Sequence, residues 1–196
     1  MRRLLDILVS ALALLALQPV FAVIALLVKV DSKGPVFFRQ KRVGKAGKLF
    51  SIHKFRTMHI LERGDEMQIS PSNDRRVTKV GVLLRKYKLD ELPQLLDVLR
   101  GSMSLVGPRP EVPRYVDLFP EQVRQVILSV RPGITDLASV AYRSEGDLLA
   151  NSEDPEQTYI NDILPKKIEL SCWHIQHGTF LIDLRILLKT IFTMFR

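Results

Sequence analysis

Residues 7–28 read ILVSALALLALQPVFAVIALLV and contain no charged side chain. As one continuous helix, this stretch would extend about 33 Å, which is enough to cross the hydrocarbon core of a bilayer. Pro19 lies near the middle, where it removes a backbone donor and clashes with the preceding turn, and the adjacent Gln18 is costly in hydrocarbon. The sequence therefore predicts an apolar helix that is broken at Gln18-Pro19.

Basic residues flank this segment on both sides, with Arg2 and Arg3 before it and Lys29 and Lys33 after it. Because Lys and Arg favour the cytoplasmic side of a membrane, both ends favour the same side. A helix that enters one leaflet, bends at Gln18-Pro19 and returns satisfies both observations, so we expect a re-entrant membrane helix. A kinked single span is the alternative, because proline is common in transmembrane helices. A signal peptide is disfavoured by the length of the apolar region.

The rest of the chain has the composition of a globular protein. With 196 residues, 46% of them hydrophobic and 26% charged, it predicts a membrane segment at 1–30 and one compact domain at 31–196. Residues 29–88 hold 16 Lys and Arg against 5 Asp and Glu, whereas the remainder is net −3. This basic half is expected to meet an anion, which nucleic acid, anionic lipid or a diphosphate substrate would each provide. Cys172 is the sole cysteine, which excludes an internal disulfide framework.

The residues that follow the apolar segment predict a β-hairpin. Residues 36–38 are typical of a short strand, Gly44 and Gly47 indicate a turn, and residues 49–58 alternate as a second strand does. The polar stretch 62–79 is expected to be a loop.

A helical pattern of leucines covers residues 82–99, but Pro93 interrupts it. Proline is tolerated only in the first turn of a helix. We therefore expect one helix to end near Lys88, a second to begin near Leu89 with Pro93 in its first turn, and Gly101 to close the second.

Two more amphipathic helices are expected, at 121–130 and at 181–196. The second carries an apolar stripe, formed by Leu184, Leu187, Leu188, Ile191, Phe192, Met194 and Phe195. Ile182 and Ile186 break the pattern. This stripe either packs on the protein core or lies in the headgroup plane of a membrane. The predicted fold is α+β and mostly helical, with a re-entrant membrane helix, a small β-hairpin and amphipathic interfacial helices around a compact domain.

Asp90 and Glu91 are the first candidates for chemistry. At the N-terminus of a helix, free backbone amides and the helix dipole favour their anionic forms, although acidic residues there are also an ordinary helix start. Arg85 lies just upstream, and Arg109 is held between two prolines in a rigid loop. Carboxylates among arginines suit Mg²⁺ bridging phosphates, and a carboxylate can itself be a nucleophile that forms an acyl phosphate.

Four further cations are candidate phosphate ligands. Lys54 and Arg56 would share one face of the second strand and present two charges to a phosphate, or simply form a solvated strand face. Arg131 and Arg143 flank the stretch Pro132-Gly133-Ile134-Thr135 and carry the same two interpretations.

Several motifs, taken together, resemble one family. In chain order they are Gly34-Pro35-Val36-Phe37-Phe38-Arg39-Gln40, Lys54-Phe55-Arg56-Thr57-Met58, Leu89-Asp90-Glu91-Leu92-Pro93-Gln94-Leu95, Met103-Ser104-Leu105-Val106-Gly107-Pro108-Arg109-Pro110 and Arg131-Pro132-Gly133-Ile134-Thr135. This order resembles the bacterial sugar transferases, the monotopic phosphoglycosyl transferases, and in particular their minimal members with a single re-entrant helix. The resemblance covers nearly the whole chain.

The resemblance implies an enzyme that transfers a sugar 1-phosphate from a UDP-sugar to undecaprenyl phosphate, releases UMP and requires Mg²⁺. It makes Asp90 the nucleophile and metal ligand and Glu91 its partner in metal binding or activation. Phosphate or nucleotide ligands are implied at Lys54, Arg85, Arg109 and Arg131. It also implies residence at the cytoplasmic face of the bacterial inner membrane, with the membrane and both substrates as partners and no nucleic acid. Association into a homo-oligomer is left open.

Two departures from the family pattern concern substrate contacts and the membrane helix. Gln18-Pro19 stands where the family usually has Ser-Pro, and Asp136-Leu137-Ala138-Ser139 stands where Gly-Trp-Ala-Gln is frequent. Two other classes are alternatives, a membrane-tethered module that only binds anions and a conventional glycosyltransferase. The second would carry an Asp-x-Asp metal site, and the chain contains no such triplet.

Overall fold

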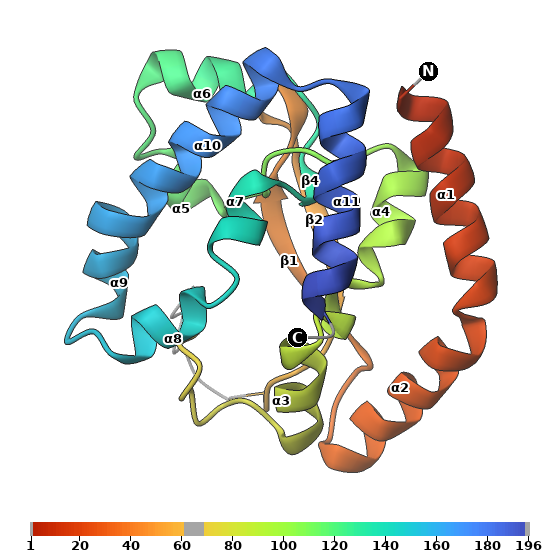
Figure 1. The fold of residues 1–196 in the computed structure, drawn as a ribbon. Coiled ribbons are helices and arrows are strands. Elements are labelled where there is room, and N and C mark those ends of the chain that lie inside the picture. Colours follow the sequence, from red (N-terminus) through yellow and green to blue (C-terminus); the bar gives the residue numbers. More distant parts are fainter. Residues whose placement is uncertain (1, 61–68, 195–196) are drawn as a thin grey trace.

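The computed structural model describes residues 2–60 and 69–194 of the chain. Helices surround two small sheets near the centre of the molecule, which confirms the mostly helical α+β prediction (Figure 1). One sheet is the hairpin of β1 (Phe37–Val43) and β2 (Leu49–Phe55), paired antiparallel. The other pairs β3 (Ser104–Val106) and β4 (Gly133–Thr135) in parallel.

The predicted break in the apolar segment is confirmed. Helix α1 (Arg2–Ala16) and helix α2 (Gln18–Asp31) meet at an angle of 63°, with Leu17 at the break and Pro19 in the first turn of α2. Among the described residues, no single helix is long and apolar enough to span a membrane, but this bent pair passes that test together, whether as a broken span or as a re-entrant loop.

Helix α1 turns its polar side chains inward and its apolar side chains outward. Its buried residues are Asp6 and Ser10, whereas Leu8, Leu12 and Leu15 are exposed. Water would penalise this arrangement, because apolar surface normally moves to the interior. The outer face of α1 is therefore suited to lipid.

The hairpin forms as predicted, but its boundaries differ. β1 runs to Val43, longer than the predicted 36–38, and β2 ends at Phe55, where its register partner is Phe37. The next backbone amide, that of Arg56, donates to the carbonyl of Val36, after which the chain leaves the sheet.

The predicted division of the 82–99 region at Pro93 is also confirmed. The chain forms α3 (Lys79–Lys86), a 3-10 turn η2 (Leu89–Glu91) and α4 (Gln94–Arg100). Lys88 adopts a left-handed conformation with φ of 53°, and Gly101 ends α4 with φ of 87°. Asp90 and Glu91 thus lie in a separate turn before α4 and not in its first turn. Pro93 has no backbone N–H to donate to the preceding turn, so the helix does not extend toward Leu89.

The remaining helices form the C-terminal half. They are α5 (Pro113–Val116), α6 (Glu121–Leu128), α7 (Leu137–Ala141), α8 (Glu145–Ala150), α9 (Pro155–Thr158), the π-helical segment η3 (Tyr159–Ile163), α10 (Leu164–His177) and α11 (Phe180–Met194). A core cluster that includes Tyr115, Phe119, Leu149 and Tyr159 holds this half together. A second cluster, around Val98 and Met103, lies beneath α1.

Of the two predictions for the apolar stripe of α11, packing on the protein core is contradicted by the structure. Leu184, Leu188 and Ile191 are exposed and Phe192 is 73% exposed, whereas Ile186, predicted to break the pattern, is 1% exposed. Beside Ile186, the inward face also carries polar groups that have partners in other elements. Asp183 Oδ1 lies 2.8 Å from His174 Nε2, and Thr190 Oγ1 lies 2.7 Å from Thr135 Oγ1. Like α1, this helix shows its apolar face to the outside.

Helix α3 approaches the exit of β2 so closely that only glycine fits at position 81. A Cβ atom there would lie 2.2 Å from the carbonyl oxygen of Thr57. Alanine normally stabilises a helix relative to glycine, but here it forces the helix away. We expect Gly81→Ala to lower the free energy of unfolding by about 2 kcal/mol, seen as a lower Tm of the detergent-solubilised protein.

The matched control is Val82→Ala, at an exposed position of the same helix. We expect it to change the free energy of unfolding by no more than about 0.5 kcal/mol. A Gly81→Ala protein as stable as the parent would contradict the close packing of α3 on β2.

Candidate active site

The adjacent carboxylates Asp90 and Glu91 are both buried, at 7% and 8% exposure. Glu91 accepts from two cations. Its Oε1 lies 2.7 Å from Lys54 Nζ and 2.8 Å from Arg109 Nη2, and its Oε2 lies 3.3 Å from Arg109 Nη1. The two contacts from Arg109 form the forked geometry that arginine makes with carboxylates. Three segments distant in the chain, β2, η2 and the loop after β3, therefore meet at Glu91.

The loop that carries Arg109 is fixed by the second sheet. The amide of Gly107 donates to the carbonyl of Thr135, and the amide of Gly133 donates to the carbonyl of Pro108. The two glycines approach so closely that a Cβ on Gly133 would lie 2.1 Å from the Gly107 nitrogen. These hydrogen bonds and the close packing of the two glycines fix the start of the loop that carries Arg109 against β4.

Asp90 and Glu91 have opposite pKa shifts although they are neighbours. Burial raises the pKa of Asp90, and the negative charge of Glu91 raises it further. Burial also acts to raise the pKa of Glu91, but the charges of Arg109 and Lys54 outweigh it and hold that pKa well below its usual range. Asp90 Oδ1 has no hydrogen-bond partner in the described part of the chain. The site thus contains one carboxylate that two cations hold in its ionised form and one with a buried oxygen that has no described partner.

Arg85 is the third predicted cation that joins this site. It extends from α3, where its Nε donates to Thr57 Oγ1 at 3.0 Å and its Nη1 donates to Ser70 Oγ at 2.6 Å. Burial lowers the pKa of Arg85, and the charge of Asp90 opposes that shift. Lys54, Arg85 and Arg109 therefore surround the carboxylate pair.

Arg56 does not stand beside Lys54. Because β2 ends at Phe55, the Arg56 side chain turns to the end of α2, where it donates to the carbonyls of Pro35 at 2.6 Å and of Ser32 at 2.9 Å and to the Ser32 hydroxyl. It is 4% exposed. The pairing of Lys54 and Arg56 on one strand face is thus not formed, and Arg56 instead holds the C-terminus of α2.

The last two predicted cations lie apart from Glu91. Arg131 is exposed, and its Nε donates to the carbonyl of Gly101 at 2.9 Å. Arg143 is half-buried after α7, and no hydrogen bond or ion pair joins it to the described residues.

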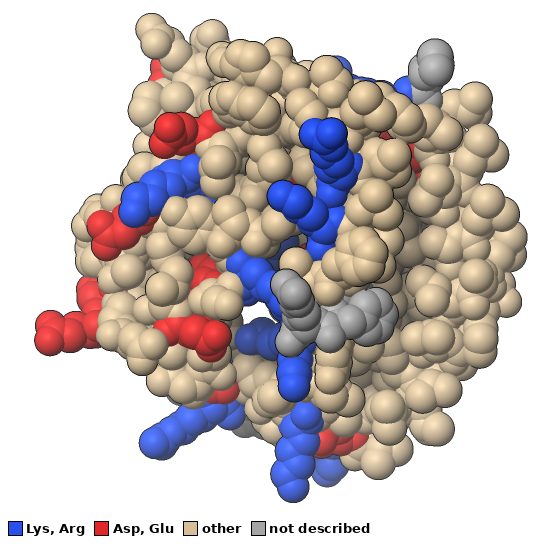
Figure 2. All heavy atoms as spheres, in the orientation of Figure 1, with Lys and Arg blue, Asp and Glu red and all other residues tan. Residues whose placement is uncertain are grey.

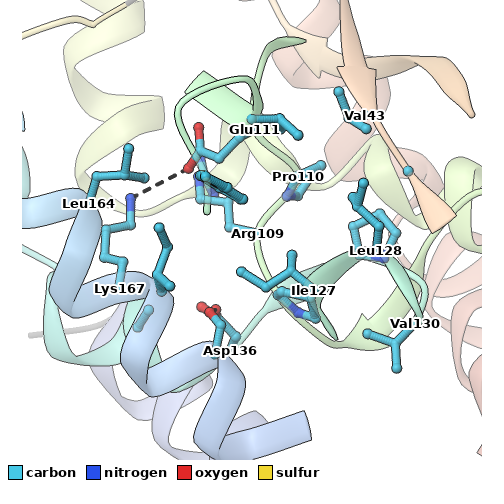
Figure 3. A pocket seen from close by; sticks show the side chains of 18 residues that line it. Val43, Arg109, Pro110, Glu111, Ile127, Leu128, Val130, Asp136, Leu164 and Lys167 are labelled. Carbon is cyan, nitrogen blue, oxygen red and sulfur yellow. Dashed lines mark hydrogen bonds and ion pairs between the residues drawn. The ribbon is translucent and has the colours of Figure 1, made fainter. Parts of the chain in front are cut away.

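A second polar network, which the sequence did not indicate, lies next to Arg109. Glu111 Oε1 accepts from the Tyr159 hydroxyl at 2.8 Å and lies 3.9 Å from Lys167 Nζ, which also contacts Glu145 at 2.9 Å. The charges of Glu111 and Glu145 add to that of Glu91 in raising the pKa of Arg109. Figure 3 shows Arg109, Glu111 and Lys167 around a cavity of about 30 Å³.

Basic side chains lie above and below a hollow at the centre of the face drawn in Figure 2, and acidic side chains gather to its left. No group of three or more His, Cys, Asp and Glu residues in the described ranges is arranged to hold a metal ion.

The model of the bacterial sugar transferase family matches residues 1–196, so the chain belongs to that family. Among curated relatives, a UDP-glucose:undecaprenyl-phosphate glucose-1-phosphate transferase of Klebsiella pneumoniae is 41% identical over 99% of this chain and 40% of its own length. A UDP-N-acetylgalactosamine-undecaprenyl-phosphate N-acetylgalactosaminephosphotransferase of Aeromonas hydrophila is 37% identical over 98% of this chain and 43% of its own length. The exopolysaccharide production protein ExoY of Rhizobium meliloti is 36% identical over 97% of this chain and 83% of its own length. The chain thus spans about two fifths of the length of the first two relatives.

The raised pKa of Asp90 predicts that this side chain destabilises the fold when it is ionised. The folded protein holds the Asp90 proton more tightly than the unfolded chain does, so stability falls as the pH rises above the ordinary value of 3.8. We expect Asp90→Asn to raise the free energy of unfolding at pH 7 by about 1–2 kcal/mol. The gain should vanish below about pH 4, where both states are protonated, and Tm measured from pH 4 to pH 8 tests this.

Glu91→Gln is the contrasting variant. Because the pKa of Glu91 is lowered in the folded protein, its ionised side chain stabilises the fold at pH values above the ordinary pKa of 4.5. This contribution is lost as the pH falls through the lowered pKa. The variant leaves Lys54 and Arg109 without their carboxylate, so we expect a loss of about 3 kcal/mol at pH 7. Equal shifts of Tm in the two variants, in either direction, would contradict the separate roles of the two carboxylates.

Proposed function

We propose that this chain transfers a sugar 1-phosphate from a UDP-sugar to undecaprenyl phosphate and releases UMP, as an early membrane step of polysaccharide or glycoconjugate synthesis. The observation that carries the proposal is the buried pair in which Glu91 is neutralised by two cations while Asp90 keeps an unpartnered oxygen. The names of the relatives, which combine UDP-sugars with undecaprenyl phosphate, support the substrate class.

The proposed mechanism has two displacements at one phosphorus atom. The Asp90 carboxylate attacks the phosphorus that bears the sugar, the bond from that phosphorus to UMP breaks, and UMP leaves with the electron pair. A phosphate oxygen of undecaprenyl phosphate then attacks the same phosphorus and displaces Asp90. Covalent catalysis of this kind divides one difficult substitution into two easier ones.

The cations would stabilise the negative charge of the diphosphate during both steps. Lys54 and Arg109 are already held by Glu91, so their positions require little rearrangement when the substrate arrives. Arg85 adds a third positive charge on the side of Asp90. In this proposal Glu91 orients the cations, Asp90 reacts, and Arg131 and Arg143 provide contacts to the more distant parts of the nucleotide sugar.

Mg²⁺ is the metal that this chemistry implies. The unpartnered oxygen of Asp90 and the oxygens of Glu91, which also accept from Lys54 and Arg109, are hard ligands of the kind Mg²⁺ takes, and this ion normally keeps waters and substrate phosphate oxygens as its other ligands. A site with few protein carboxylates fits that preference. Asp90 and Glu91 are the residues that would hold the ion, which when bound would neutralise phosphate charge.

The membrane placement follows from the outward apolar faces of α1, α2 and α11. Val23 and Leu26 of α2 are exposed like the leucines of α1, and α3 exposes Val82 and Leu83. We propose that α1 and α2 form a re-entrant helix, that α3 and α11 lie at the interface, and that residues 31–196 form the catalytic domain at the cytoplasmic face of the bacterial inner membrane. Such a position would place the site beside the phosphate of a lipid substrate.

The reaction is tested with a panel of UDP-sugars and undecaprenyl phosphate, in which released UMP is measured. We expect UMP and not UDP, and protein that carries labelled phosphosugar when the lipid is omitted. Asp90→Asn should lower turnover by about 10³-fold or more and abolish the label. Asp117→Asn, at an exposed aspartate, is the matched control. Release of UDP, or a labelled Asp90→Asn protein, would refute the mechanism.

The topology is tested with single cysteines near the two ends of the helix pair, Arg2→Cys and Lys33→Cys, in a Cys172→Ser background. A re-entrant helix leaves both cysteines protected from an impermeant reagent in intact cells and reactive after permeabilisation. Gln18→Leu combined with Pro19→Leu restores an unbroken apolar helix, so we expect it to move the N-terminus across the membrane and to lower activity. External labelling at only one end of the unaltered helix pair would instead establish a single span.

A further inference from the structure

The polar inner face of α1 contacts the chain segment that connects the two carboxylates to Arg109. Asp6 is 9% exposed. Its Oδ2 accepts from the Ser104 hydroxyl at 2.6 Å, and its Oδ1 accepts from the Leu105 amide at 3.3 Å. A carboxylate in a helix with an apolar outer face thus has two partners in β3.

The Leu105 amide depends on Asp6 because of the geometry of the small sheet. In the ladder with β4, Ser104 pairs with Gly133 and Val106 pairs with Thr135. The Ser104 amide donates to the carbonyl of Pro132, toward β4, and successive amides of a strand point to opposite edges, so the Leu105 amide points to the edge of β3 away from β4. Helix α1 covers that edge, and Asp6 supplies the acceptor that a neighbouring strand would otherwise provide.

Arg3 contacts the other end of the same connection. Its guanidinium donates to the carbonyl of Leu99 at 3.3 Å and to that of Met103 at 3.4 Å. Leu99 is in the last turn of α4, the helix that begins three residues after Glu91, and Arg109 follows Leu105 by four residues. Helix α1 therefore holds the segment from α4 to β3, which joins Glu91 to Arg109 along the chain.

We propose that Asp6 is a positioning residue, which fixes the edge of β3 against the membrane helix and thereby sets where Arg109 stands relative to Asp90 and Glu91. It contacts no substrate. The inference rests on the proposed function for its kinetic readout only, because the contact itself can be measured without substrate. A displacement of about 1 Å at a reacting group is enough to reduce a rate by about 100-fold.

The experiment compares Asp6→Leu with Asp6→Asn in the full chain, reconstituted in bilayer discs. Leucine keeps the approximate volume of the side chain but offers no acceptor. Asparagine can accept from the Leu105 amide and donate to the Ser104 hydroxyl. Ser10→Ala is the matched control, because Ser10 is buried one turn along the same face and its hydroxyl has no partner in the described chain.

We expect Asp6→Leu to reduce kcat for UMP release by about 10-fold or more and to accelerate hydrogen exchange at the Leu105 amide. Asp6→Asn and Ser10→Ala should stay within about 3-fold of the parent in kcat, with Leu105 exchange close to that of the parent. Rescue by asparagine is the result that a merely apolar packing role would not give.

Two results overturn the inference. One is an Asp6→Leu protein with the kcat and the Leu105 exchange of the parent. The other is an Asp6→Asn protein as impaired as Asp6→Leu, and this comparison remains decisive if the leucine variant does not fold. A parent protein that releases no UMP from any UDP-sugar would refute the proposed function instead, and the exchange of Leu105 in the same variants would still test the contact.

Discussion

The ion cluster at Glu91 is the interaction on which the arrangement of the site depends. Lys54, Glu91 and Arg109 come from a strand, a 3-10 turn and an irregular loop, and none of these segments would hold a charged group in the interior alone. Removing charges from water is costly unless each finds a partner, so the three segments are stable only when they meet. The unpartnered oxygen of Asp90 is the consequence, because Glu91 has taken the nearest cations.

The two carboxylates show how one local turn can produce two chemical roles. They share a turn and similar burial, so the direction of each pKa shift is decided by which one the cations reach. Where the environments of paired titratable groups push their pKa values apart, the groups usually have different roles. A side chain that destabilises the fold, as ionised Asp90 does, is also typical of sites where function and stability conflict.

Features set by local chemistry could be predicted from the sequence, and those set by distant contacts could not. Pro19 and Pro93 each interrupt a helical pattern, so the bend and the division near Pro93 were predictable, whereas the separate turn at Asp90 was not, because the sequence predicted one helix from Leu89 onward. The role of Arg56 was not, because the end of β2 depends on its pairing with β1. The partners of Lys167 come from other segments and have no local signal. For α11 the sequence left two alternatives, packing of the apolar stripe on the core or exposure at a membrane surface, because an amphipathic pattern alone does not say what covers its apolar face.

Helices α1 and α11 share this reversed pattern, and their polar contacts join them to each other and to the site. Arg2 lies 3.3 Å from Asp183 at the start of α11, while Asp6 on the next turn of α1 bonds to β3. The surface suited to lipid and the loop of Arg109 are therefore parts of one connected framework. In the proposed reaction the lipid phosphate has a height fixed by the bilayer, so the enzyme must hold its own site at a matching height. In the proposed placement of α1, polar side chains on its inner face meet that requirement, because apolar contacts with lipid set the depth of the helix but not its position along the domain.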